Sequence, residues 1–226
     1  MKLTKTDYLI YKDCAKNAWL KVHKPDIYFT KPLSVFDQGI IETGNEVDEL
    51  ARDLFPGGVL LSDRNATEET KKLIESQAHV IYQQVFETGL YKVISDILVW
   101  NPDAENYDLY EVKASNSGEN KKAKDELYSL DIAFQYLVLK ELKIPIGRLF
   151  LIRLNSKYVR EENLNIHQLF KKEDFTERVR GIADTVAVEI KTAYDYISQE
   201  KEPFGSCDCI TRGRSAHCTT FSYSNP

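Results

Sequence analysis

The alternation of apolar and polar residues between positions 92 and 113 predicts a β-hairpin. The runs KVISDILVW and YDLYEVK are rich in β-branched and aromatic residues, and the Asn-Pro-Asp between them is typical of a turn. A hairpin that is symmetric about this turn has three facing pairs: Trp100 with Tyr107, Leu98 with Leu109, and Asp96 with Glu111.

Apolar residues at helical spacing elsewhere in the chain predict an α/β protein. The expected helices cover residues 4–24 (capped by Thr4 or Thr6), 35–54, 67–89 (with a capping box at Thr67 and Thr70), 127–142, and from 174 or 176 to 199. Strands are expected at 59–61 and 146–154, a flexible loop at 114–127, and a polar, peripheral segment at 155–175.

The hairpin carries a set of charged residues that suits a metal site. In the expected register Asp96, Glu111 and Lys113 project from one side of the sheet, and Asp96 interrupts an otherwise apolar run. Two facing carboxylates repel each other unless a cation lies between them, and with the carbonyl of Val112 they form an oxygen site suited to Mg²⁺ or Mn²⁺.

Such an ion activates a water molecule, and Lys113 would orient that water or stabilise the leaving charge. The pattern therefore predicts phosphodiester hydrolysis. The alternative is a surface hairpin whose charged residues are simply solvated.

The segments ISDILV and YEVKAS resemble the core motif of the PD-(D/E)xK nuclease superfamily, in its RecB-like exonuclease branch, which includes the four-cysteine CRISPR-associated exonuclease. The resemblance implies a restriction-endonuclease-like core, a central mixed sheet flanked by helices. It also implies that the substrate is DNA, either single-stranded or with free ends.

Two further segments extend this resemblance. The family has a Gly-x3-His element before the hairpin; here Gly44 is followed by Asp48, so Asp48 or Glu46 would supply the additional metal ligand, unless both are surface carboxylates. DIAFQY resembles the glutamine motif of the branch, which implies that Gln135 positions a catalytic group. The competing interpretation of Gln135 is a hydrogen-bonded residue of the core.

Three of the four cysteines lie near the carboxyl end, as Cys207, Cys209 and Cys218, and the fourth is Cys14. The resemblance implies that they form a staple that joins the ends of the domain. Four thiolates suit a [4Fe–4S] cluster or a tetrahedral zinc ion; His217 is an alternative ligand, and free cysteines remain an alternative to any metal site.

Composition adds limits to these predictions. A chain of 226 residues with 42% hydrophobic and 29% charged residues is expected to form one domain, 1–226. It has no apolar run of membrane-spanning length and no signal sequence, so we expect a cytoplasmic protein without a membrane partner. Because the chain has a net charge of −5, it can bind DNA only through a local basic surface. A catalytically weak nucleic-acid-binding module and an iron–sulfur sensing protein of the same fold are the alternative functions.

Overall fold

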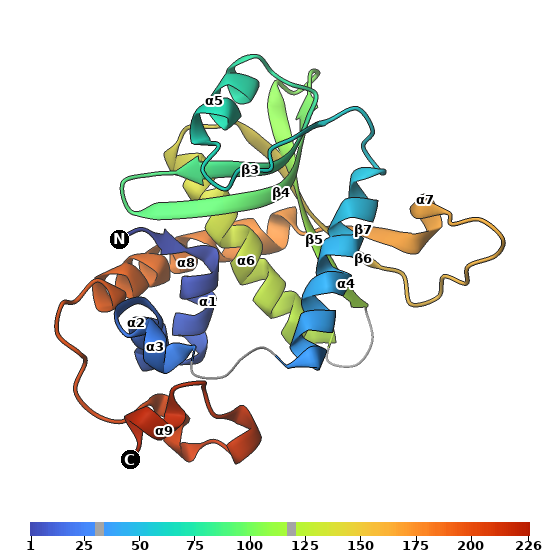
Figure 1. The fold of residues 1–226 in the computed structure, drawn as a ribbon. Helices are drawn as coiled ribbons and strands as arrows, with labels where there is room; N and C mark the ends of the chain where they lie inside the picture. Colours follow the sequence, from blue (N-terminus) through green and yellow to red (C-terminus); the bar gives the residue numbers. More distant parts are fainter. Residues whose placement is uncertain (30–33, 117–120) are drawn as a thin grey trace.

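The computed structural model of the chain describes residues 1–29, 34–116 and 121–226, which contain a seven-stranded mixed sheet (Figure 1). Five strands lie side by side in the order β3-β4-β5-β6-β7, the short β2 pairs with β3, and the short β1 pairs with β4. The strands are β1 (Leu3–Thr4), β2 (Val59–Leu60), β3 (Val80–Glu87), β4 (Tyr91–Asn101), β5 (Asn106–Asn116), β6 (Ile146–Leu154) and β7 (Phe170–Asp174). Strands β3, β4 and β5 are antiparallel neighbours, whereas β5 and β6 are parallel.

Helices cover both faces of this sheet. They are α1 (Lys5–Asp13), α2 (Ala15–His23), α3 (Pro25–Tyr28), α4 (Val35–Arg52), α5 (Thr67–Glu75), α6 (Lys121–Glu141), α7 (Ile166–Leu169), α8 (Thr176–Ile197) and α9 (Phe221–Ser224), with 3₁₀ turns at Asp208–Thr211 and Arg214–Ala216. The prediction of an α/β fold with a central mixed sheet flanked by helices is confirmed.

The sheet separates two apolar cores. On one face, residues of α1, α6 and α8 pack against β4 and β5, with Tyr8, Phe134 and Leu109 fully buried. On the other face, Val47 and Ala51 of α4 pack against strand residues that include Tyr110. Burial of each apolar side chain contributes about 1.5–3 kcal/mol, so both helical layers are held to the sheet by hydrophobic packing.

The predicted hairpin is confirmed, and so is its register next to the turn, but the pairing ends at Ile97 and Tyr110, so the expected facing pair of Asp96 and Glu111 lies beyond it. Strands β4 and β5 pair Trp100 with Tyr107 and Leu98 with Leu109. The predicted helix at 35–54 and strand at 146–154 are also present, as α4 and β6. Thr4 caps α1 as expected, because its side chain accepts a hydrogen bond from the backbone nitrogen of Asp7.

The predicted helix at 67–89 is wrong. The helical part ends at Glu75, and residues 80–87 form β3, a buried strand of the sheet. The segment VIYQQVF is rich in β-branched and aromatic residues, so the sheet, which buries both of its faces, overrides its helical periodicity. The predicted capping box is also absent, because the helix is capped by Ala66 without a side-chain hydrogen bond.

Three other boundaries differ from the predictions. The expected helix at 4–24 is broken at Cys14, whose backbone is extended (φ −155°, ψ 107°). Of the loop expected at 114–127, residues 117–120 lie outside the described residues, and the rest belongs to β5 and α6. The segment 155–175, expected to be peripheral, contributes β7 to the sheet. Helix α8 begins after Phe175 and has no side-chain cap, although the Asp174 carboxylate accepts from the backbone nitrogen of Thr176 at 2.8 Å.

The carboxyl-terminal part of the chain packs against its first helices. In the view of Figure 1, the segment after α8 runs down past α2 and α3, and α9 lies below them. Trp19 Nε1 donates to the carbonyl of Gln199 at 2.8 Å, and Lys24 Nζ donates to Glu202 at 2.7 Å. Within the described residues, no helix combines the length and apolar character needed to cross a bilayer.

Candidate active site

The charged residues of the hairpin line a cleft of about 830 Å³. Asp96, Glu111, Val112 and Lys113 lie in it together, so the structure brings the predicted residues to one place. The α1 end of the cleft adds Lys5, and α4 adds Gly44 and Asp48. Its basic residues outnumber its acidic ones: Lys5, Lys21, Arg52, Arg64, Lys92 and Lys113 against Asp48, Asp63, Asp96 and Glu111. The lining of the cleft is therefore more basic than the chain as a whole, which has a net charge of −5.

The Asp96 carboxylate is bound to the neighbouring strand. Strands β4 and β5 are paired as far as Ile97 and Tyr110, and beyond this pair Asp96 Oδ2 accepts a hydrogen bond from the backbone nitrogen of Val112 at 2.8 Å. A side chain thus replaces a backbone partner at this point of the sheet. The hydrogen bond holds Asp96 directly beside Glu111.

Glu111 is buried and is the centre of a hydrogen-bond network. Its Oε1 accepts from Lys113 Nζ and, at 3.0 Å, from Lys5 Nζ, while Oε2 accepts from Gln135 Nε2 at 2.6 Å. A buried carboxylate needs such partners, since an unpaired one would be strongly destabilising. The predicted group of Glu111, Lys113 and Gln135 is therefore assembled by strand β5 and helix α6.

Asp131 is a site residue that the sequence reasoning missed. It lies one turn before Gln135 on α6, is buried, and accepts hydrogen bonds from Lys113 Nζ (2.6 Å) and Gln135 Nε2 (3.1 Å). Lys5 Nζ is also 3.0 Å from Asp131. A signal was present in the sequence, because Asp131 is an acidic residue within the apolar run LDIAFQYLVL, one helical turn from the glutamine.

Lys5 was also missed, and no local signal pointed to it. It lies 106 positions before Glu111 and reaches the site because β1 pairs with β4 and so places the start of α1 beside the hairpin. Its side chain is 20% exposed, towards the cleft.

The two carboxylates suggested as additional ligands occupy different positions. Asp48 lines the cleft, whereas Glu46 is exposed on α4 and does not line it. Asp48 pairs with Arg52 and accepts from Gln83 Nε2 at 3.1 Å; the same nitrogen is 3.4 Å from Asp96 Oδ1. Gln83 has a left-handed backbone (φ 57°), which is uncommon for a non-glycine residue in a strand and accompanies this bridge between α4 and β4.

Gly44, the glycine of the expected metal-ligand element, lies in α4 and lines the cleft. A Cβ atom added at Gly44 would meet nothing within 4 Å, so no neighbouring side chain or backbone packs closely on it. The open space arises because Gly44 faces the cleft rather than a packed element.

Burial raises the pKa of Asp96, and Asp48 adds to this effect, while Lys5, Lys113 and the Val112 backbone nitrogen oppose it. Burial lowers the pKa of Lys113, but the carboxylates of Glu111, Asp131 and Asp96 outweigh it and leave the pKa well above its usual value. The pKa of Lys5 is raised in the same way by Asp131 and Glu111 against the effect of burial. Both lysines are therefore cationic at neutral pH, which makes them hydrogen-bond donors rather than bases.

The donor set fits a hard divalent cation. Asp48, Asp96 and Glu111 offer carboxylate oxygens around one cleft, and among the described residues Gln135 Oε1 is buried without a hydrogen-bond partner. Oxygen ligands of this kind are those that Mg²⁺ and Mn²⁺ prefer.

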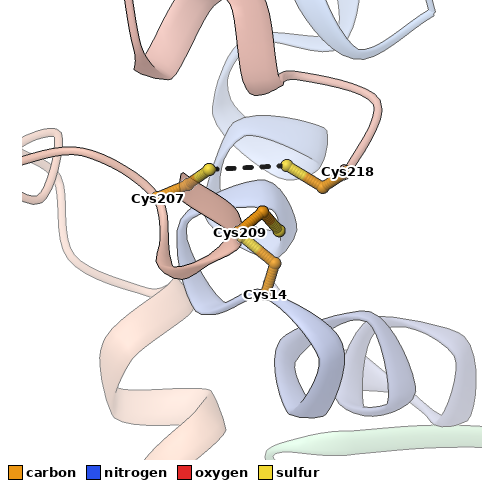
Figure 2. Close-up of side chains that lie close together, drawn as sticks. All are labelled: Cys14, Cys207, Cys209 and Cys218. Atoms are coloured by element: carbon orange, nitrogen blue, oxygen red, sulfur yellow. Dashed lines mark hydrogen bonds between the residues drawn. The ribbon is translucent and has the colours of Figure 1, made fainter. Parts of the chain in front are cut away.

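A second candidate metal site lies apart from the cleft and contains all four cysteines (Figure 2). The Sγ atoms of Cys14, Cys207, Cys209 and Cys218 all lie within 4.8 Å of one another, and the first three residues are buried. The expectation that cysteines from the two ends of the chain meet is confirmed, and the four thiols can hold a metal.

His217, considered as an alternative ligand, has other contacts. Its Nε2 lies 2.9 Å from the carbonyl oxygen of Arg212, and its ring stacks on Phe221. The guanidinium of Arg212 binds Asp13 at 2.6 Å and so fastens the tail to the end of α1.

No family model and no curated protein match the sequence. Solved structures that the chain matches include an alkaline exonuclease from Laribacter hongkongensis, with 11% sequence identity and a TM-score of 0.38; the match covers 87% of this chain and 91% of that chain. Another is the protein SSO0001, with 10% identity and a TM-score of 0.39; the match covers 90% of this chain and 87% of that chain. A third is a phage-related exonuclease from Haemophilus somnus, with 11% identity and a TM-score of 0.35; the match covers 80% of this chain and 92% of that chain.

Proposed function

We propose that residues 1–226 form a metal-dependent deoxyribonuclease of the PD-(D/E)xK type, which acts as an exonuclease on DNA that is single-stranded or has free ends. One observation carries the proposal. Asp96, Glu111 and Lys113 line a single cleft. Lys113 Nζ donates a hydrogen bond to Glu111, and Asp96 accepts one from the backbone nitrogen of Val112, the residue between Glu111 and Lys113. Two adjacent carboxylates and an ammonium group are the elements needed for phosphodiester hydrolysis.

Asp96, Glu111 and the carbonyl of Val112 would hold Mg²⁺ or Mn²⁺, with Asp48 completing the oxygen ligands from α4. When bound, the ion supplies an acidified water and neutralises charge on the phosphate. Glu46 is not needed for this site, because Asp48 is the carboxylate of α4 that lines the cleft.

The other residues have distinct roles in this proposal. The Lys113 ammonium, held by Glu111 and Asp131, donates to the attacking water or to the charge that develops on the leaving oxygen. Gln135 and Asp131 keep Glu111 and Lys113 in place. Lys5 adds a second positive charge beside Glu111, where it would attract the backbone phosphates of the substrate.

The direct test is cleavage of end-labelled single- and double-stranded DNA with Mg²⁺, Mn²⁺ or EDTA. A covalently closed circle serves as the substrate without ends. We expect metal-dependent degradation of the linear substrates only, and its loss in Lys113→Ala. Lys157→Ala, which changes an exposed lysine that does not line the cleft, is the matched control.

Each other outcome has a defined meaning. Cleavage of the circle would replace the exonuclease by an endonuclease. If the folded protein binds DNA but neither it nor Lys113→Ala cleaves any substrate, the chain is a nucleic-acid-binding module. If it also fails to bind DNA, a sensing function of the cysteine site becomes the better proposal.

A further inference from the structure

We infer that the four cysteines bind one tetrahedral metal ion, and that this ion is zinc rather than a [4Fe–4S] cluster. The inference concerns the cysteine site alone. It depends on the spacing of the four sulfur atoms and on the contacts that fix that spacing, and it does not require the cleft to be catalytic.

The spacing of the sulfur atoms matches a single ion. A zinc–sulfur bond is about 2.3 Å long, so neighbouring thiolates of a tetrahedral zinc site lie about 3.8 Å apart. Cys207 Sγ and Cys218 Sγ are 3.8 Å apart, as the dashed line in Figure 2 marks, and no two of the four sulfurs are separated by more than 4.8 Å.

A [4Fe–4S] cluster requires a wider arrangement. Each of its four cysteines binds a different iron and points away from the cluster centre, so the four Sγ atoms are farther apart than around one ion. The space between the sulfurs must also contain four irons and four sulfides. Four thiols that lie within 4.8 Å of one another leave room for one ion only.

The contacts around the site fix this narrow spacing. Asn17 Oδ1, on α2, accepts hydrogen bonds from the side chains of Thr219 and Thr220 at 2.9 Å, directly after Cys218. Lys16 Nζ donates to the carbonyl of Gly205, two residues before Cys207. With the ion pair of Arg212 and Asp13, these bonds attach both cysteine-bearing parts of the tail to α1 and α2. They therefore resist a displacement of the tail that would move Cys207 and Cys218 away from Cys14.

A hydrogen bond from a neighbouring side chain completes the site. Asn225 Nδ2 donates to Cys207 Sγ at 3.1 Å. Donors to metal-bound sulfur orient the ligand and reduce its charge, as outer partners do in zinc sites generally. The segment CDC places Cys207 and Cys209 at the start of a 3₁₀ turn, where Cys207 is the N-cap, and brings both sulfur atoms into the group of four.

Metal analysis of the full chain tests the inference. The protein is purified anaerobically from cells supplied with iron and zinc, and its zinc, iron and acid-labile sulfide are measured per chain. We expect one zinc and neither iron nor sulfide. Exchange of the zinc for Co²⁺ is expected to give the intense visible absorption of tetrahedral cobalt thiolate.

Variants identify the ligands. Cys209→Ser and Cys218→Ser are each expected to lose most of the bound zinc, whereas His217→Ala, the matched control beside the site, retains it. Apoprotein treated with Fe²⁺ and sulfide under anaerobic conditions is expected to remain colourless. A brown protein with about four irons and four sulfides per chain would overturn the inference. So would wild-type protein that contains no metal.

These readouts are independent of nuclease activity. Zinc in a protein that cleaves no DNA would support this inference and contradict the proposed function. A [4Fe–4S] cluster in an active nuclease would contradict this inference and support the proposed function.

Discussion

Lys5 and Cys14 lie at opposite ends of one short helix. Lys5 is the first residue of α1 and reaches Glu111 and Asp131 in the cleft, at 3.0 Å from each. Cys14 is the C-cap of the same helix and belongs to the cysteine cluster. A nine-residue helix on its own is marginal in water. Fixing its carboxyl end at the cysteine cluster therefore also fixes the position of Lys5 in the cleft.

Replacing Lys5 by methionine is expected to lower kcat at least roughly tenfold, because Glu111 and Asp131 each lose one of their two lysine partners. The Mg²⁺ concentration for half-maximal activity should fall as well, because Lys5 no longer occupies Glu111 Oε1. Steady-state cleavage rates over a Mg²⁺ titration measure both quantities. Lys2→Met, which removes a surface lysine paired with Glu87, is the control. An unchanged metal requirement would show that Lys5 does not compete with the cation.

Replacing Cys14 by serine is expected to lower both Tm and activity, because it removes one of the four thiols inferred to bind zinc. A metal held there would stabilise the fold by binding only the folded chain. A loss of about 3 kcal/mol corresponds to a fall in Tm of about 6–12 °C for a chain of this size. Calorimetry and the cleavage assay measure the two effects, with Ser206→Ala as the control. A metal-free variant with wild-type cleavage rates would contradict the link through α1.

Replacing Asp131 by asparagine keeps the shape of the side chain but removes its charge. Asparagine offers one acceptor oxygen in place of two, so it cannot accept from both Lys113 and Gln135 as Asp131 does. We expect nuclease activity to fall roughly 10- to 100-fold, as is usual when a group that orients a catalytic residue is lost. Glu126→Gln, on the exposed side of the same helix, is the control. Equal activity of the two variants would show that Asp131 is not needed.

The pH dependence of stability is expected to reflect Glu173. A hydrogen bond from Arg153, whose side chain is fully buried, holds the pKa of Glu173 below its usual value. A carboxyl group whose pKa is lowered on folding stabilises the protein above its unfolded pKa, about 4.3 for Glu. This contribution disappears as the pH falls below that value and through the lower pKa of the folded state.

The variant Glu173→Gln tests whether the ion pair with Arg153 causes this pH-dependent stability. We expect a loss of about 2 kcal/mol at pH 7, because Arg153 is left with Asp125 as its ion-pair partner. The loss should shrink as the pH falls below about 4.3. Denaturant unfolding between pH 3 and pH 7 measures it, with Glu161→Gln as the control for an exposed carboxylate. A difference that does not change with pH would rule out the ion pair as its cause.

Local patterns determined part of this structure. The hairpin and its register follow from residues that are neighbours in the sequence, and a two-residue period fixes which side chains share a face. Asp96, Glu111 and Lys113 could therefore be placed together from the sequence. Helix α4 and strand β6 were predicted for the same reason, since their apolar positions repeat over a sufficient length.

Only the tertiary structure decided the rest. The segment 80–87 has a helical apolar spacing, and it becomes β3 because the sheet offers backbone partners on both sides, a context that no local window contains. Lys5 enters the site through the pairing of β1 with β4, and Asp131 through the packing of α6 on β5. The number of cysteines suggested a metal, but the distances between their sulfurs, from which we infer one ion rather than a cluster, depend on how the carboxyl-terminal tail packs on the first helices.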